Sequence, residues 1–298
     1  MGEELESISL SSNTFGPVLI SRLLLNNNLL ILVFNYIIFL ISFHLLRNFK
    51  QLNPIKLALF LISSPMLFSS ITTLNKEILS FFCVSFLISI SNKRLTVFNI
   101  LIVMFSSLLV RWQMIVVSAL FLFLNKVVRK DLRSRFISII SFLMLLSFLY
   151  PFIRNFLDLD VVLSVDQYTE TSESNSGFIY MLNSLQNNYM LFFSFVPKTL
   201  MNLVANPGKL FQSYDTLSNP YDIYNNYVVP GQGLITTLLI ILSFKKFRIN
   251  SFNSSHYLIL IYSIVFSLSP FIQTRYFFPL YPLLCIQASQ RVKSVIHQ

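Results

Sequence analysis

Charge, glycine and cysteine are all scarce in this chain of 298 residues. Charged side chains make up 11% of it, against about 25% in an ordinary soluble domain, and there are only six glycines. The low charge excludes a soluble enzyme, and the lack of a glycine period excludes a collagen-like repeat. The only two cysteines, Cys83 and Cys285, lie inside apolar runs. We therefore expect two small buried side chains and no disulfide scaffold.

Apolar residues, in contrast, are plentiful along the whole chain. They account for 54% of it, with 31 phenylalanines and a mean hydropathy of +0.67. Since a membrane-spanning helix needs about 20 largely apolar residues, we predict an all-α integral membrane protein with about nine transmembrane helices, within a range of 8 to 10. The expected spans are Leu29–Leu46, Lys56–Thr73, Ile78–Asn92, Thr96–Val110, Met114–Asn125, Phe136–Phe152, Pro230–Phe244, Tyr257–Phe271 and Tyr276–Ser289.

Basic residues give the orientation. The net charge is +10, and the densest basic cluster is Lys126–Arg135. Because cytoplasmic loops carry the excess of Lys and Arg, we place this cluster inside, the N-terminus outside and the C-terminus in the cytoplasm. The chain then divides into an outer segment 1–28, membrane helices 1 to 6 in 29–152, an outer loop 153–229, and membrane helices 7 to 9 with the C-terminus in 230–298.

Two stretches depart from the pattern of simple spans joined by loops. Residues 96–125 could form one long helix, but this would put Lys126–Arg135 outside, so we predict a tight hairpin with Arg111 at its outer tip. In the outer loop, Asp166–Gly177 has the composition of a loop. Tyr189–Val204, interrupted by Pro197, is typical of an amphipathic or re-entrant helix at the outer surface.

Three cations depart from the inside preference. Lys76, Arg111 and Arg275 each lie in a very short outer connection between apolar segments. A convergent set of ammonium and guanidinium groups suits a phosphate or pyrophosphate, because arginine offers a planar fork to its oxygens. The alternative is that each cation reaches the headgroups separately as an interface anchor.

Two acidic features are candidates for chemistry. Glu77 follows Lys76 and is a candidate general base; alternatively, Asn75 caps a helix and Glu77 only favours its first turn. Asp158 and Asp160 form a D-x-D, a spacing that metal-dependent sugar transferases use, but a lone D-x-D is weak evidence and a solvated loop is the favoured alternative.

Tyrosines mark the end of the outer loop. Tyr221 and Tyr224 lie among Asp and Asn residues just before an outer helix end. They are candidates for stacking on sugars, or for an ordinary interfacial aromatic belt. The three histidines are scattered, and no nucleotide-binding, hydrolase or metal motif occurs, so we expect no metal and no cofactor.

Three segments carry a family resemblance. They are Pro65–Leu79 (PMLFSSITTLNKEIL), Val110–Trp112, and Pro270–Leu284 (PFIQTRYFFPLYPLL), an outer arginine followed by an aromatic, proline-broken helix. Together they resemble Wzy-type polymerases, which join the oligosaccharide repeat units of O-antigen and capsule. The last segment also resembles GT-C type glycosyltransferases, which use lipid-phosphate sugar donors.

The polymerase resemblance implies an enzyme of the bacterial inner membrane that polymerises undecaprenyl-pyrophosphate-linked repeat units. Its partners would be this lipid-linked oligosaccharide and the bilayer, with room for a chain-length regulator protein and no role for nucleic acid. It would also make the chain short at its N-terminal end, with 1–28 as the remnant of a longer first part. The implied catalytic residues are Glu77, Arg111 and Arg275, and the implied substrate-binding residues are Lys76, Arg154, Tyr221, Tyr224 and Tyr276.

Other functions are left open beside polymerisation. A GT-C type transferase would add a single sugar, a flippase or transporter would need a polar pathway through the bundle, and a structural subunit of an export complex would tolerate loss of all three outer cations.

Overall fold

The computed structural model describes residues 15–49, 52–73, 75–91, 93, 95–128, 131–156, 176–204, 210, 223–246, 253–269 and 274–290. Within these ranges every regular element is a helix, which confirms the expected all-α class for this part of the chain. The helices are α1 (Phe15–Leu23), α2 (Asn28–Arg47), α3 (Pro54–Ile62), α4 (Pro65–Thr72), α5 (Lys76–Ile90), α6 (Val97–Val110), α7 (Trp112–Val127), α8 (Leu132–Phe156), α10 (Ser176–Asn187), α11 (Leu191–Val204), η3 (Tyr224–Val228), α13 (Val229–Lys246), α14 (Ser254–Ser267), η5 (Thr274–Leu280) and α15 (Tyr281–Ser289).

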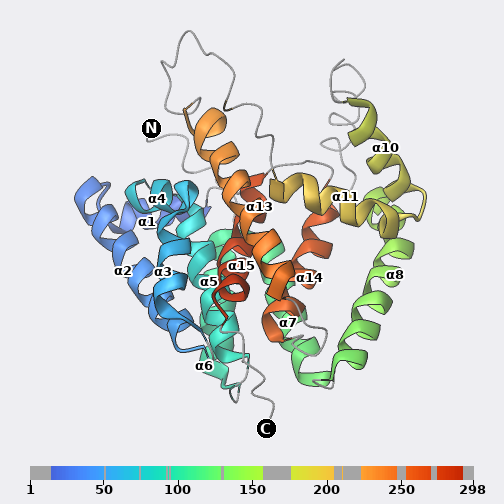
Figure 1. The fold of residues 1–298 in the computed structure, drawn as a ribbon, viewed down its shortest axis with the longest axis horizontal. Coiled ribbons are helices and arrows are strands. Elements are labelled where there is room, and N and C mark those ends of the chain that lie inside the picture. The colour runs from blue at the N-terminus through green and yellow to red at the C-terminus, as the bar shows by residue number, and fades with distance from the viewer. Residues whose placement is uncertain are drawn as a thin grey trace.

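The helices form one bundle with α5, α14 and α15 near its centre (Figure 1). Helix α5 packs against α2, α6 and η5, while α14 packs against α7 and α11. Helix α8 stands at the right edge of the view, and α11 lies across the upper part of the bundle between α13 and α8. The site described below lies where α5, α14 and η5 meet.

Several helices have the length and composition of membrane spans. Among the described residues, three are long and apolar enough: α2, residues 133–152 of α8, and residues 224–244 of η3 and α13. The bent pair α3 and α4 makes a fourth if it counts as one span. Helices α6, α7, α11 and α14 are apolar but shorter. The nine spans expected from the sequence stay a prediction.

Large apolar side chains are exposed on several of these helices. On α2, Asn35 and Ser42 are buried, whereas Leu29, Val33 and Ile37 are exposed. Exposed apolar residues continue along α6, α8 and α13. A contiguous apolar exterior of this kind marks a surface that contacts something other than water, so these helices are suited to a membrane.

The expected span Lys56–Thr73 is wrong as a single helix, because the chain bends by 73° between α3 and α4. Pro65 begins α4, and its ring holds Ser64 in an extended conformation. The Ser64 hydroxyl accepts a hydrogen bond from the Leu67 amide at 3.0 Å and donates one to Oε1 of Gln232 at 2.5 Å. Ser64 therefore caps the start of α4 and links the break to α13.

The break predicted at Arg111 is present. Arg111 is extended (φ −171°, ψ 152°) and both ends α6 and begins α7. The hydroxyls of Ser107 and Ser118 lie 2.8 Å apart, and Ser107 also contacts the Cys83 sulfur at 3.2 Å. Residues this far apart in sequence meet only when the two helices fold back on each other. Cys83 and Cys285 are free and buried, as expected.

Other boundaries differ from those expected. The predicted helix Tyr189–Val204 begins at Leu191, and Pro197 lies inside α11 without interrupting it. Helix α10 was not predicted; it starts at Ser176, inside the expected loop Asp166–Gly177. The expected span at Tyr276 opens as the 3-10 helix η5, with Pro279 inside it, before α15 begins at Tyr281.

A hydrogen-bond network joins the ends of four helices. Nη2 of Arg135 donates to Oδ1 of Asn125 at 3.0 Å, and the Asn125 amide donates to the Ser91 carbonyl at 2.8 Å. The hydroxyls of Ser138 and Tyr257 lie 2.8 Å apart. These bonds connect the ends of α5 and α7 with the starts of α8 and α14. Arg135, predicted to lie in a cytoplasmic basic cluster, is buried.

Gly16 gives a test of how α1 is attached. A Cβ at this position would lie 1.8 Å from the Leu109 carbonyl oxygen on α6, so we expect Gly16→Ala to destabilise the protein by about 1–3 kcal/mol through overpacking. The matched control is Gly231→Ala, whose Cβ would meet Pro65 at an ordinary 3.5 Å. Thermal unfolding in detergent should show a lower midpoint for the first variant only. Equal midpoints would contradict this close packing.

Candidate functional site

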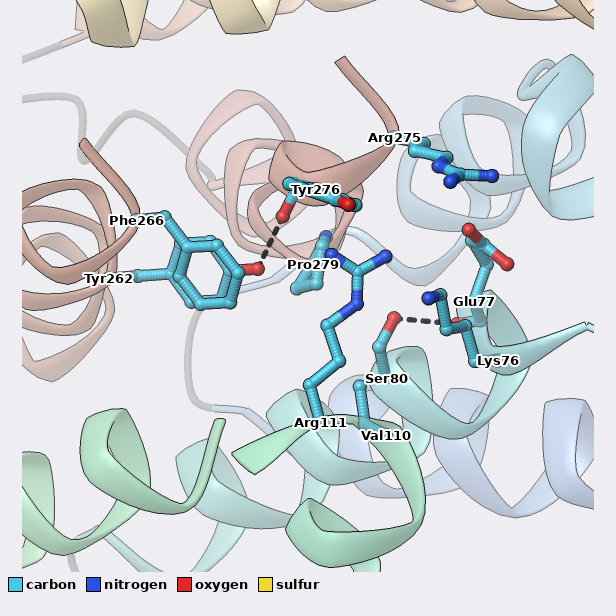
Figure 2. Close-up of a pocket in the computed structure, with 10 residues that line it drawn as sticks. All are labelled: Lys76, Glu77, Ser80, Val110, Arg111, Tyr262, Phe266, Arg275, Tyr276 and Pro279. Carbon is cyan, nitrogen blue, oxygen red and sulfur yellow. Dashed lines mark hydrogen bonds between the residues drawn. The ribbon is translucent and has the colours of Figure 1, made fainter. Parts of the chain in front are cut away.

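One pocket gathers side chains from four parts of the chain (Figure 2). The enclosed space is small, with a cavity volume of about 10 Å³, which is room for about one water molecule, so a phosphate group would enter only if the lining side chains move apart. The lining residues are Lys76, Glu77, Ser80, Val110, Arg111, Tyr262, Phe266, Arg275, Tyr276 and Pro279.

The three cations that the sequence predicts on the outer side converge on the ring of Tyr276. The guanidinium carbon of Arg111 lies 3.6 Å from the ring centroid, that of Arg275 lies 5.7 Å away, and the ammonium of Lys76 lies 6.0 Å away. Figure 2 shows Arg111 rising from the α6 and α7 junction toward this ring. Cations within about 6 Å of an aromatic centroid are attracted by its quadrupole. Tyr276 thus brings together the cations that the sequence singled out.

Glu77 contributes the negative charge of the pocket. It lies in the first turn of α5 and is 3% exposed, while Arg111 is 7% exposed. The alternative reading of Asn75 as a side-chain cap is not seen: Asn75 stands at the N-cap position, but its side chain makes no capping bond. Among the lining residues three cations therefore face one carboxylate, which leaves an excess of positive charge.

The wall formed by α14 was not predicted from the sequence. The Tyr262 hydroxyl donates to the backbone carbonyl of Tyr276 at 2.5 Å, which orients the start of η5. Tyr262 and Phe266 stack with centroids 4.2 Å apart and their planes nearly parallel. Both lie in an apolar run where nothing distinguishes them from core residues, so only their spatial partners reveal their role.

Buried side chains form hydrogen bonds with the backbone at two helix ends, one before Lys76 and one before Arg275. On α2, the Asn35 side chain donates to the carbonyls of Ser70, Ile71 and Thr73 at 3.0–3.3 Å, just before Lys76. These carbonyls lie at the end of α4, where intrahelical partners run out. Asn35 therefore fixes the chain on its way into α5.

The backbone at the end of α14, before Arg275, accepts hydrogen bonds from side chains of α10 and α11. Gln186 donates to the Leu268 carbonyl at 2.9 Å, and the Lys198 ammonium donates to the Ser269 carbonyl at 3.3 Å. Lys198 also bonds Oε1 of Gln186 and is 1% exposed. A cation at a helix C-terminus is favoured by the macrodipole. The chain leaving α14 toward Arg275 is thereby anchored.

The remaining predicted site residues are only partly described. Tyr224 lies close enough to Glu77, Arg275 and Arg111 to interact electrostatically with them, which places it at the edge of the pocket. Arg154 belongs to the last turn of α8, but its side chain is outside the described residues. Tyr221 and the Asp158–Asp160 pair also lie outside them.

The described residues provide no group of three or more His, Cys, Asp or Glu side chains that could hold a metal ion. No match to this chain was found among protein-family models, curated proteins or solved structures. A function therefore has to be inferred from the chemistry of the pocket.

Lys76 has an unusual acidity for a lysine. It precedes the span expected from Ile78, and burial and then the charge of Arg111 lower its pKa to about 8, with Arg275 adding to the lowering and Glu77 opposing it. The ammonium is the major form below this pH and the neutral amine above it. An anion bound beside Lys76 would favour the charged form and raise the pKa again.

We expect Arg111→Gln to raise the pKa of Lys76, because the substitution removes a neighbouring positive charge. Fewer neutral amines at pH 8 should slow acetylation of Lys76 by acetic anhydride severalfold, as followed by peptide mass spectrometry. Arg47→Gln, on the exposed end of α2, is the control and should change nothing. Acetylation as fast as in the wild type would contradict the coupling between Arg111 and Lys76.

Proposed function

We propose that this pocket binds the diphosphate of a lipid-linked sugar at the outer face of the bacterial inner membrane. The observation that carries the proposal is the convergence of Lys76, Arg111 and Arg275 on one tyrosine ring. Guanidinium groups pair with phosphate oxygens in a bidentate fork, and the lysine adds a compact charge. With one carboxylate among them, the cations retain a net attraction for a multiply charged anion.

The Tyr276 ring supports the proposal that these cations bind a diphosphate. The aromatic face holds the Arg111 guanidinium by its quadrupole, and this contact does not neutralise the positive charge. The alternative in which each cation separately anchors the interface is less favoured, because Arg111 and Glu77 are buried in the same pocket.

The reaction we propose is polymerisation of undecaprenyl-pyrophosphate-linked repeat units into O-antigen or capsule, by the family resemblance described above. The sugar hydroxyl of the incoming unit bonds to the anomeric carbon of the growing chain, and the bond from that carbon to the pyrophosphate oxygen breaks. The electron pair leaves with undecaprenyl pyrophosphate, whose charge Lys76, Arg111 and Arg275 stabilise. Glu77 accepts the proton of the attacking hydroxyl.

The surrounding protein fits the same proposal. The nine expected spans would place the pocket near the outer ends of the helices, with the C-terminus in the cytoplasm. Arg154 in the last turn of α8, Tyr221, and Tyr224 at the start of η3 would contact the sugars. A chain-length regulator would be a partner outside the pocket.

Surface polysaccharide from the native host tests the proposal directly. After deletion of the gene, the gel ladder should collapse to a core bearing one repeat unit, and the wild-type gene should restore it. Arg275→Ala should fail to restore it at normal protein abundance, whereas Arg47→Ala, which changes an exposed cation far from the pocket, should succeed. Loss of even the single unit would instead indicate a sugar transferase or flippase, and an unchanged ladder would contradict a polymerase.

Inorganic pyrophosphate tests the pocket in purified protein. Trp112 is the only tryptophan and follows Arg111 in the sequence, so its fluorescence is a native signal for a titration. Cation and ring contacts are worth about 0.5–2 kcal/mol, so Tyr276→Leu should weaken binding about tenfold. Tyr276→Phe keeps the ring and should bind within about threefold of the wild type. Equal affinity in both variants would contradict the role of the ring.

A further inference from the structure

Helix α11 has its polar and apolar sides reversed relative to a surface helix in water. The side turned into the bundle carries Ser194, Lys198 and Asn202, all of which are buried. The side turned outward consists of large apolar residues. These exposed residues are Phe192, Phe193, Val196 and Leu200, with Phe193 65% exposed.

Hydrogen bonds fix this orientation. The Lys198 ammonium bonds Gln186 and the Ser269 carbonyl, and the Asn202 amide donates to the Lys198 carbonyl at 2.9 Å. The start of the helix is held as well, because the Leu191 amide donates to the Ser147 hydroxyl of α8 at 3.1 Å. Turning the apolar side inward would carry the Lys198 ammonium out of the bundle and away from both of these acceptors.

The outward side of α11 continues an apolar surface of a candidate membrane span. Helix α8 packs against both α10 and α11, and its exposed Phe148 and Phe152 contact the ring of Tyr189 at 6.1 and 6.3 Å between centroids. Phe178 and Met181 of α10 are exposed in the same way. In Figure 1, α8, α10 and α11 form one side of the molecule.

We propose that the acyl chains of the bilayer cover the outward side of α11 together with the adjoining part of α8. An ordinary interfacial helix turns its polar side to water and its apolar side to the membrane. Here the polar side is already occupied by the protein, so lipid is the environment that the other side fits. Part of the outer loop, where the sequence predicts an amphipathic or re-entrant helix at the outer surface, therefore lies at the depth of the lipid. This inference holds whatever the pocket binds.

Nitroxide labels on single cysteines test the proposal. The full chain would be labelled at Phe193→Cys, Val196→Cys or Leu200→Cys and placed in vesicles of phosphatidylethanolamine and phosphatidylglycerol. Relaxation by oxygen, which enters lipid, is compared with relaxation by a water-soluble nickel chelate. The native Cys83 and Cys285 are fully buried, so unsubstituted protein gives the background.

Two reference positions calibrate the comparison. Met144→Cys reports the exposed face of the α8 span, and Asn48→Cys reports the exposed end of α2. We expect the three α11 labels to behave like position 144, with relaxation by oxygen at least severalfold stronger than by the nickel chelate. Stronger relaxation by nickel would show a water-covered helix, and protection from both reagents would show a second copy or another protein on this side. Either result overturns the proposal.

Discussion

Helices that end inside an apolar bundle leave backbone carbonyls and amides that water does not reach, and this constraint shapes the structure around the pocket. The free carbonyls at the end of α4 receive the Asn35 side chain, and those at the end of α14 receive Gln186 and Lys198. The break before Pro65 receives Gln232 through Ser64. In lipid every such group must be satisfied internally, and the buried side chains of Asn35, Gln186, Lys198 and Gln232 meet this need at the helix breaks.

The same constraint explains why the pocket has its position. Lys76 and Arg275 follow the two capped helix ends, and Arg111 is itself the break between α6 and α7. Lys76 begins α5 and Arg275 lies at the start of η5, and each follows a helix end whose carbonyls accept hydrogen bonds from neighbouring helices. Tyr276 then provides a neutral surface on which three like charges can gather. The anchored backbone and the shared Tyr276 ring together oppose the mutual repulsion of the cations.

Charge placement predicted more of this molecule than local propensity did. No proline or glycine marks the break at Arg111, yet the distribution of basic residues requires one, and it is present. Lys76, Arg111 and Arg275 could be singled out from the sequence because each departs from the preference of basic residues for the cytoplasmic side. The apolar run Lys56–Thr73 predicts an unbroken span, although Ser64–Pro65 is an ordinary signal for a helix break. Tyr262, Asn35 and Lys198 were out of reach, because their importance depends on contacts between distant segments.

The Tyr276 ring has a consequence for how the protein matures during synthesis. Lys76 and Arg111 emerge from the ribosome well before the tyrosine on which they rest. Until η5 and α14 have been synthesised, the Tyr276 ring and the α14 wall of the pocket are missing. The pocket is thus a late product of biogenesis, completed by the C-terminal helices, and a nascent chain that has inserted only its first helices carries the charges but not the site.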